Sequence, residues 1–405
     1  HERGGRRADC DADGHADGGV VGGENTYGLG VLAFLARLRE RLGPGRLVTA
    51  DGHSGRHQRG FGLLNGIESE GWPHLRDRRV TDFSGGLNRH AFWAARGAAP
   101  VFNYVNHKFV EPTGQPGRPN HRPEVPWSIH RLVLAAAVMT DSAVCYSYAP
   151  PAEPGESLGI WDELVRGRDR QVGWLGRPTG PARHLALDAP DAFGGAGDPP
   201  GEVFCKRLSG KNLRFAAAED GVRVAQADGE TGPIKFRLAG IPCRGPDLVV
   251  RVTMRAAPLP GYPERMARLA HVGIAPPQGK PVRYITWVDG GAFTSYAYFS
   301  EIRSKTVDLA LEVEGGEPVW ITRVTAHAAP DALVRLFERG VVLANPSPRR
   351  ATFDLKALAP GRQFCRLRGS SRQDPETNSG EPVGQTVTLG PKDALFLVDA
   401  EAPEP

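Results

Sequence analysis

Short apolar runs alternate with amphipathic segments over residues 19–148. Apolar side chains recur at helical spacing within residues 30–43, and segments 87–97 and 127–140 have the same character. The pattern predicts short strands in the runs between these segments: GVV (19–21), RLVTAD (46–51), GFGLLNGI (60–67), PVFNYVNH (100–107) and SAVCYSY (142–148). Strands that alternate with helices are typical of parallel βα units.

These units supply about half of the strands of an eight-stranded barrel. The sequence therefore predicts a multidomain fold, α/β plus all-β, whose residues 1–200 form a partial (β/α) TIM-type barrel, its C-terminal half. Folded proteins avoid the open strand edge that a half barrel leaves, so we expect the other strands to precede His1. Residues 149–202 are rich in proline and glycine and predict a linker packed on the barrel.

From residue 203 onward the apolar period changes to that of β-strands. Runs such as DLVVRVTMR and VRYITWV alternate apolar and polar residues, and Asp289-Gly290-Gly291 has the chemistry of a hairpin turn. Many short strands at even spacing predict β-sandwiches. We expect a jelly-roll, galactose-binding-like sandwich at 203–330 and a C-terminal antiparallel sandwich at 331–405, the latter completed by a strand at 203–208.

Composition narrows the class of ligand. The formal net charge of +4 is small for 405 residues, and the arginines are scattered, so no nucleic-acid partner is predicted; a neutral sugar fits this balance better. The longest apolar run, Leu132–Met139, is far shorter than a membrane span, so no membrane partner is predicted either. The five cysteines lie far apart without a C-x-x-C pair, which indicates neither a disulfide framework nor a zinc ribbon.

The start of the chain has neither an initiator methionine nor an apolar signal segment. Two locations remain open: secretion, with a signal peptide upstream of this chain, or the cytoplasm. The sequence does not set the oligomeric state.

Acidic side chains follow several predicted strands. Cleavage of a glycosidic bond needs two carboxyl groups, one as proton donor and one ionised, and in a βα barrel such groups lie at the carboxyl ends of the strands. Glu70 follows the strand ending at Ile67, and Glu24 and Asp51 follow the two strands before it. Trp72 could stack on the apolar face of a sugar ring. The alternative is that these carboxylates are solvated loop charges and Trp72 is a core residue.

Other polar residues cluster at the same strand ends, and we expect them to contact substrate: His53, Asn103, Tyr104, His107, Tyr146 and Tyr148. His53 and His57 have the spacing of a helical zinc pair, but they lie in a glycine-rich loop without the H-E-x-x-H context, so no metal or organic cofactor is predicted. Ser54 lacks the G-x-S-x-G context of a hydrolase nucleophile.

Four aromatic residues of the predicted jelly roll allow two interpretations: Tyr284, Trp287, Tyr296 and Tyr298. They could form a carbohydrate platform. Their alternation also suits ordinary sandwich packing, which we favour.

Several segments resemble one known family: GLGVLAFLARLRERLGPGRLVTADG, LLNGIESEGWP, PVFNYVNHKF and RGVVLANPSPRRATFDL. They look like the glycosyl hydrolases of the TIM-barrel glycosidase superfamily, in which a barrel is followed by β-sandwich modules. The resemblance implies that Glu70 is the general acid/base and that an Asp belongs where this chain has Gly22, with Glu24 two residues on.

Three functions follow as hypotheses. The first is a glycoside hydrolase acting on a poly- or oligosaccharide by a two-carboxylate mechanism. The second is a non-catalytic carbohydrate-binding protein in which the Asp is lost. The third, an interaction scaffold, is favoured if the aromatic residues at 284–298 are buried.

Overall fold

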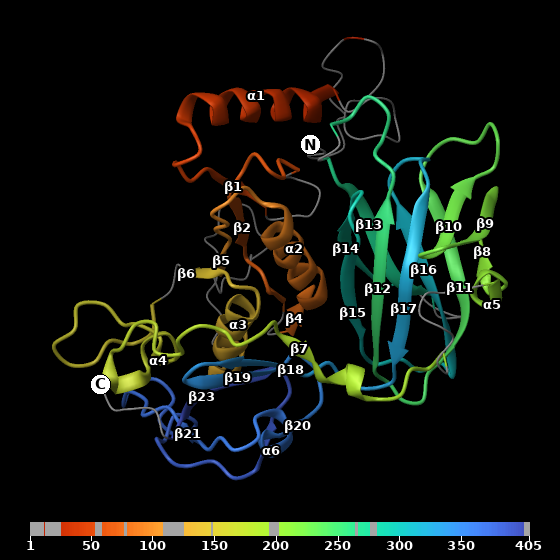
Figure 1. Ribbon diagram of the computed structural model, residues 1–405. Coiled ribbons are helices and arrows are strands. Elements are labelled where there is room, and N and C mark those ends of the chain that lie inside the picture. The colour runs from red at the N-terminus through yellow and green to blue at the C-terminus, as the bar shows by residue number, and fades with distance from the viewer. Residues whose placement is uncertain are drawn as a thin grey trace, which may run out of the picture. The chain divides into compact units, whose positions relative to one another are not determined.

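The computed structural model describes residue 12 and residues 26–52, 59–76, 79–107, 125–146, 149–193, 202–263, 266–275 and 282–400. The chain forms two compact units. Unit 1 comprises His1–Glu68, Ser84–Asn103 and Ala189–Ala329, and unit 2 comprises Ser69–Phe83, Tyr104–Asp188 and Pro330–Pro405. Antiparallel sheets dominate both units, and helices are few (Figure 1).

A two-sheet antiparallel sandwich forms the larger part of unit 1. Its first sheet, named here the Trp320 sheet, has the strand order β15 (Phe293–Phe299), β12 (Leu248–Ala256), β17 (Val319–His327), β10 (Gly221–Gln226) and β9 (Leu213–Ala218). Its second, the Trp287 sheet, has the order β14 (Val282–Val288), β13 (Arg268–Ala275), β16 (Thr306–Val313), β11 (Ile234–Pro242) and β8 (Leu208–Ser209). The short helix α5 (Glu202–Cys205) precedes β8. The antiparallel sandwich expected after residue 203 is therefore present.

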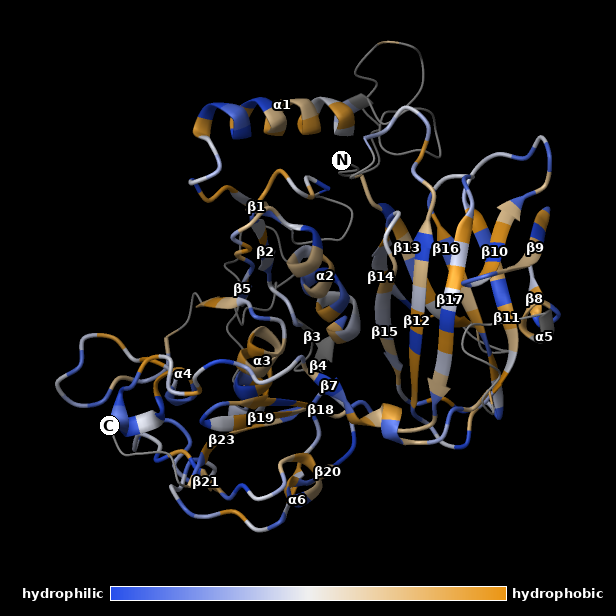
Figure 2. Cartoon of the chain, viewed as in Figure 1, coloured by the Kyte–Doolittle hydropathy of each residue, from blue (hydrophilic) through white to orange (hydrophobic). Residues whose placement is uncertain are grey.

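Alternation of side chains explains this architecture. Along β12, Val250 and the two residues that alternate with it, Val252 and Met254, are buried in the core between the sheets. The residues between and after them are half-buried on the outer face: Arg251, Thr253 and Arg255. The same alternation of apolar and polar colour follows the strands of the sandwich in Figure 2. An alternation with a period of two residues fits a strand that has one face in the core and the other face toward solvent.

The βα segment of unit 1 contributes α1 (Thr26–Leu42), β1 (Thr49–Asp51) and α2 (Phe83–Arg96), and β2 (Gly66–Glu70) continues across the boundary into unit 2. β1 and β2 pair in parallel. An apolar cluster around Phe61, Phe92 and Trp287 packs this segment on the outer face of the Trp287 sheet. Two ion pairs join the same parts: Arg59 with Glu314, 2.6 Å, and Arg96 with Asp289, 2.5 Å.

The strand predicted at 60–67 lies later in the chain. Residues 60–64 form a turn in which the amides of Leu63 and Leu64 both donate to the carbonyl of Gly60, at 3.0 Å. β2 then begins at Gly66 and includes Glu68 and Glu70. Gly66 is required because a Cβ there would lie 2.0 Å from the carbonyl oxygen of Phe102. The predicted strand at 19–21 lies outside the described residues.

Unit 2 combines a second parallel strand pair with a C-terminal β-structure. β5 (Tyr104–His107) pairs in parallel with β6 (Ala143–Tyr146), and α3 (Trp127–Met139) lies between them in sequence. The parallel pairs agree with the predicted βα units. The described residues do not show a TIM-type barrel, so the partial barrel stays a prediction.

The C-terminal sheet of unit 2 has the order β21 (Phe364–Arg366), β23 (Asp393–Asp399), β19 (Gly340–Asn345), β18 (Leu333–Phe337) and β7 (Arg183–His184). The smaller elements of the unit are β3 (His74–Arg76) paired with β4 (Arg79–Thr81), β20 (Ala351–Asp354) paired with β22 (Thr386–Leu389), α4 (Asp162–Val165), α6 (Leu355–Leu358), and the 3₁₀ turns Gly167–Asp169 and Leu185–Asp188. Helix α3 packs on β19 and β23.

The prediction that a strand at 203–208 completes this C-terminal sheet is wrong. β8, at Leu208–Ser209, pairs with β11 in unit 1, and β7 takes the edge position next to β18. Its His184 contacts the buried Asp331 through Nδ1 and Oδ1 at 2.7 Å, and the amide of Leu185 donates to the carbonyl of Ala332 at 2.8 Å. The predicted linker therefore contributes a strand to the C-terminal sheet.

Helix α2 covers the edge of the Trp320 sheet at β15. The side-chain amide of Asn88 donates to the carbonyl of Tyr296 at 2.8 Å and accepts from the amide of Tyr296 at 2.9 Å. The hydroxyl of Ser84 accepts from the amide of Tyr298 at 3.0 Å. An unpaired strand edge is a site for unwanted pairing, and here side chains of a helix satisfy part of it.

Replacing Asn88 with Ala is expected to lower the free energy of unfolding by about 1–3 kcal/mol, because two backbone groups of Tyr296 lose their partner at a buried position. Urea unfolding followed by circular dichroism measures this change. Ala91→Gln, on the exposed side of α2, is the control and is expected to change stability by less than about 0.5 kcal/mol. Equal stability of the two variants would contradict the role of Asn88.

Candidate functional site

The structure describes only part of the predicted site. Glu24, His53 and Tyr148 lie outside the described residues. His107 and Tyr146 are opposite each other at the ends of β5 and β6, but their side chains are outside the described part. For these five residues, the predicted roles stay predictions.

Asp51 is placed beside a carboxylate, but not the one expected. In the parallel pair β1–β2, Asp51 is the register partner of Glu68, and the amide of Gly52 donates to the carbonyl of Glu68 at 2.7 Å. Neighbouring strands lie about 4.8 Å apart, so two acidic residues stand side by side, Asp51 at the carboxyl end of β1 and Glu68 in the middle of β2. Asp51 is exposed and Glu68 is half-buried.

Glu70 lies two residues further along β2, on the same side of the strand as Glu68. Ser69 between them is fully buried, whereas Glu70 is half-buried. Glu68 is not among the predicted catalytic residues, for which the preceding strand is taken to end at Ile67. The true extent of β2 makes Glu68 the direct neighbour of Asp51.

Two predicted substrate contacts point into the protein. Trp72 is 0 % exposed; its Nε1 donates to the carbonyl of Asp82 at 3.0 Å, and its ring lies 5.9 Å from that of Phe83. It offers no ring face to solvent. Asn103 is also buried, and its Oδ1 accepts from the amide of Ile67 at 3.0 Å, so it holds β2 in place. Tyr104, opposite Ala143, is half-buried.

The aromatic residues at 284–298 divide between core and surface. Trp287 is 1 % exposed within the apolar cluster, and Tyr298 is 7 % exposed with its hydroxyl donating to Asp247 Oδ1 at 2.7 Å. Tyr284 and Tyr296 are half-buried, and Tyr284 packs against the sandwich core. This burial is what the packing interpretation predicted, and it leaves the platform hypothesis without most of its residues.

A different aromatic residue lies on the outer face of the Trp320 sheet. The strand register aligns Ala216 of β9, Arg223 of β10, Trp320 of β17 and Arg255 of β12 in one row across the sheet. The inward neighbours Val319 and Ile321 belong to the core, so Trp320 faces outward, where it is half-buried. This row is named here the Trp320 row.

Arg255 fixes the tryptophan ring. Its guanidinium carbon lies 4.1 Å from the ring centroid of Trp320, and its Nε donates to Asp220 Oδ2 at 2.8 Å. The hydrogen bond from Arg255 lowers the pKa of Asp220, so this carboxylate is ionised at neutral pH. Stacking on the guanidinium restricts the indole to one orientation, and the opposite ring face points away from Arg255.

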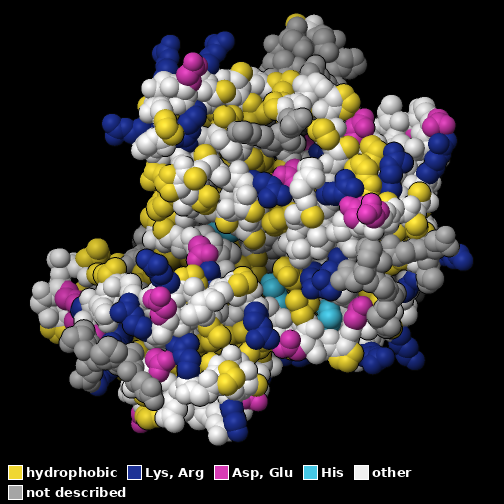
Figure 3. Space-filling model, viewed as in Figure 1, with side chains coloured by type: hydrophobic (Ala, Val, Ile, Leu, Met, Phe, Trp, Pro, Cys, Tyr) yellow, Lys and Arg dark blue, Asp and Glu magenta, His cyan; other side chains and the backbone are white. Residues whose placement is uncertain are grey.

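Hydroxyl groups occupy the next row of the same face. Thr253 of β12 and Thr294 of β15 are register partners, and their Oγ1 atoms are hydrogen-bonded at 2.8 Å. Arg323 of β17 is the partner of Thr253 on the other side and is exposed. In Figure 3 the side of the sandwich turned to the viewer carries basic and acidic side chains beside hydrophobic atoms. We name the outward residues of these two rows the Trp320 face.

Unit 2 holds two buried carboxyl groups with shifted pKa values, a feature that often marks functional sites. Burial raises the pKa of Glu163, although Asn378 and Arg131 oppose the shift. Burial also raises the pKa of Asp162, against the hydrogen bonds from Ser370. Their exposed fractions are only 4 % and 0 %.

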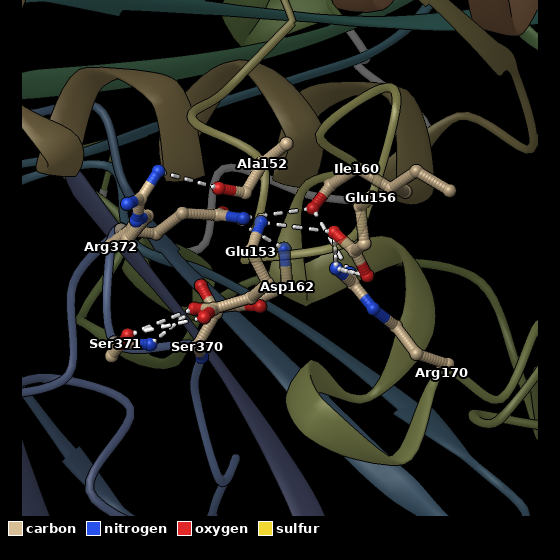
Figure 4. A network of polar contacts seen from close by, with 10 residues as sticks. Ala152, Glu153, Glu156, Ile160, Asp162, Arg170, Ser370, Ser371 and Arg372 are labelled. Carbon is tan, nitrogen blue, oxygen red and sulfur yellow. Dashed lines mark hydrogen bonds and ion pairs between the residues drawn. The ribbon is translucent and has the colours of Figure 1, made fainter.

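The partners of Asp162 show a structural role (Figure 4). Its Oδ2 accepts from the amide of Ser370 at 2.8 Å and from the hydroxyl at 3.1 Å, while Glu153 accepts from the amide of Ser371 at 2.7 Å. Glu163 accepts from Asn378 at 3.0 Å. These bonds attach the segment after residue 149 to the loop that follows β21, so the two buried acids support the fold rather than an open site.

The described residues show neither a metal-type cluster nor a membrane-spanning helix. No three His, Cys, Asp or Glu side chains come together there as a metal site requires. No helix in the same part of the chain has the length and apolar character to cross a membrane.

No protein-family model matches the sequence, and no curated protein matches it. Solved structures that match include carbohydrate-binding modules. TmCBM61, in complex with β-1,4-galactotriose, has 12 % identity and a TM-score of 0.25 over 34 % of this chain and 98 % of its own. CBM6cm-2 from Cellvibrio mixtus lichenase 5A, in complex with cellotriose, has 11 % identity and a TM-score of 0.22 over 31 % and 94 %. The CBM22-1 xylan-binding domain from Paenibacillus barcinonensis Xyn10C has 11 % identity and a TM-score of 0.23 over 30 % and 84 %. At these TM-scores, the similarity assigns neither a family nor a ligand to this chain.

The raised pKa of Glu163 predicts a pH dependence of stability. The carboxyl group of Glu163 keeps its proton to a higher pH in the folded state than in the unfolded state. The stability that the neutral acid contributes is therefore lost as the pH rises from 4.5, the ordinary pKa of this group, through its pKa in the folded state. Relative to Glu163→Gln, the wild type is expected to lose about 1 kcal/mol or more of unfolding free energy over this interval. Urea unfolding at about pH 5 and about pH 7.5 measures the difference.

Asp188→Asn serves as the control because this side chain is 65 % exposed. It is expected to change stability equally at both pH values. Parallel pH profiles for wild type and Glu163→Gln would refute the assignment.

Proposed function

We propose that the sandwich of unit 1 binds carbohydrate on the Trp320 face. The observation that carries this proposal is the Trp320 row, in which an outward indole is flanked in register by Arg223 and Arg255. A sugar ring has an apolar face of C–H groups and a rim of hydroxyls. An indole offers a large apolar surface to the first, and guanidinium N–H groups donate to the second.

The row is organised before a ligand arrives. Arg255 is held by Asp220 at 2.8 Å and lies over the ring of Trp320, so the indole is fixed in place. Beyond Arg223 the row continues with the small, exposed Ala216. From Ala216 to Arg255 the row crosses three strand intervals, about 14 Å, so it suits a chain of sugars rather than one ring. A rigid site lowers the entropic cost of binding.

A second candidate function is glycoside hydrolysis, and one observation favours it. Asp51, at the end of β1, stands opposite Glu68, in the middle of the parallel strand β2. Carboxyl groups about 5 Å apart are the spacing of a retaining glycosidase. The adjacent strands bring the two residues into that range. Glu68 would then act beside or instead of Glu70 as the proton donor.

Replacing Trp320 with Ala is expected to weaken binding to a responsive polysaccharide at least about tenfold, or 1.4 kcal/mol, because the stacking surface is removed. Affinity electrophoresis against a panel of soluble plant, bacterial and fungal polysaccharides finds the ligand, and titration calorimetry measures the affinity. Trp320→Phe, which keeps an aromatic face, is expected to retain part of it.

Arg237→Ala is the matched control, because this arginine lies on the outer face of the Trp287 sheet with a side chain 59 % exposed. It is expected to bind as the wild type does. The proposal fails if the folded wild type binds no polysaccharide, or if Trp320→Ala binds as tightly as Arg237→Ala.

The hydrolytic candidate predicts that reducing sugar is released and that Glu68→Gln lowers the rate roughly 10²–10⁴-fold by removing a proton donor. Asp51→Asn and Glu70→Gln test the remaining carboxylates, and Glu40→Gln on the exposed side of α1 is the control. Loss of activity in Glu70→Gln alone would assign the donor to Glu70. A wild type that releases no reducing sugar from any polysaccharide it binds would rule out hydrolysis by this chain.

A further inference from the structure

The two outer faces of the sandwich differ in the charged residues that their strands carry. On the Trp287 sheet, cations are paired with carboxylates of neighbouring strands. Lys235 and Arg283 both contact Glu312, each at 3.1 Å, and Arg237 lies 3.9 Å from Asp308. This is the pattern of an ordinary solvated sheet, in which opposite charges face each other across strands.

The Trp320 sheet has a different composition. The outward positions of its five described strands carry five arginines and no Asp or Glu: Arg214, Arg223, Arg251, Arg255 and Arg323. Carboxylates reach this face from turns. Asp220 precedes β10 and contacts Arg255, and Asp228 follows β10 and contacts Arg214 at 2.5 Å. The charged side chains at the strand positions around Trp320 are therefore all basic.

A β-bulge concentrates this charge around the indole. In the pairing of β12 with β17, the register shifts between Thr253 and Met254, so that Thr322 is the extra residue on β17. Trp320 and Arg323 consequently both face outward although three positions separate them. Arg223 is the neighbour of Trp320 across the sheet, and both Arg223 and Arg323 are exposed.

We propose that the Trp320 face selects an acidic polysaccharide whose sugar rings carry carboxylate groups, that is, a chain of uronic acids. This inference rests on the proposed carbohydrate binding and names the class of ligand. The planar guanidinium donates two parallel hydrogen bonds to a carboxylate, which gives direction as well as charge attraction. Trp320 stacks on the sugar ring, and Arg223 and Arg323 bind the carboxylate at the edge of that ring.

Polygalacturonate and its fully methyl-esterified form are the matched pair of ligands, because they share one backbone and differ in charge. By titration calorimetry, the wild type is expected to bind polygalacturonate at least tenfold more tightly than the ester. This preference is expected to shrink at high salt, since exposed ion pairs are screened. The double variant Arg223→Gln/Arg323→Gln is expected to bind the ester somewhat more weakly than the wild type does and to lose the preference for the acid. Arg237→Gln, on the other sheet, is the control and is expected to keep it.

The outcomes separate this inference from the proposed function. Equal affinity for the acid and the ester would overturn the inference and leave carbohydrate binding intact. No binding of either ligand, or of any other glycan, would overturn both. Tighter binding of dextran sulfate than of polygalacturonate would replace carboxylate with sulfate as the recognised group. Binding of single-stranded oligothymidylate as tight as that of polygalacturonate would show a general polyanion surface and would also overturn the inference. Circular dichroism of each variant confirms that it is folded.

Discussion

The exclusion of water from the space between the two sheets of the sandwich is the constraint on which unit 1 depends. Val250, Val252 and Ile321 are fully buried there, and each dictates that its neighbours in sequence point outward. Strand pairing then fixes those neighbours in rows. Trp320, Arg223 and Arg255 therefore occupy set positions because of a core that they do not touch. A surface built in this way is as rigid as the sheet beneath it.

The strands of the sandwich could be predicted from the sequence because their signal is local. Alternation over DLVVRVTMR is visible within nine residues, and it also tells which side chains face outward. The order of the strands is not local. Trp320 and Arg255 are far apart in the chain, and only the antiparallel register of β12 and β17 makes them neighbours. The Trp320 face was consequently absent from the predicted site, although each of its strands was expected.

The carboxylates show the same limit in a different form. Asp51 and Glu70 were identified as strand-end residues, but a shift of the strand end beyond Ile67 makes Glu68 the residue opposite Asp51. Burial was equally hidden, because nothing local distinguishes the fully buried Trp72 from an exposed plate. The segment after residue 149 looked like a linker by composition. Its buried Asp162 and the partners of that acid attach it to the C-terminal part of unit 2 instead.

The bulge at Thr322 affects how strand β17 can change in length among related chains. On a regular strand, residues three apart face opposite sides, so the extra residue is what allows Trp320 and Arg323 to share one face. Deleting that single residue would restore regular alternation, in which Trp320 and Arg323 still face outward and Val324 still faces the core. A deletion of this one residue is thus open to gradual evolution. In a lineage of related chains, the length of this strand is expected to vary by this one residue while the residues that face the core keep their order.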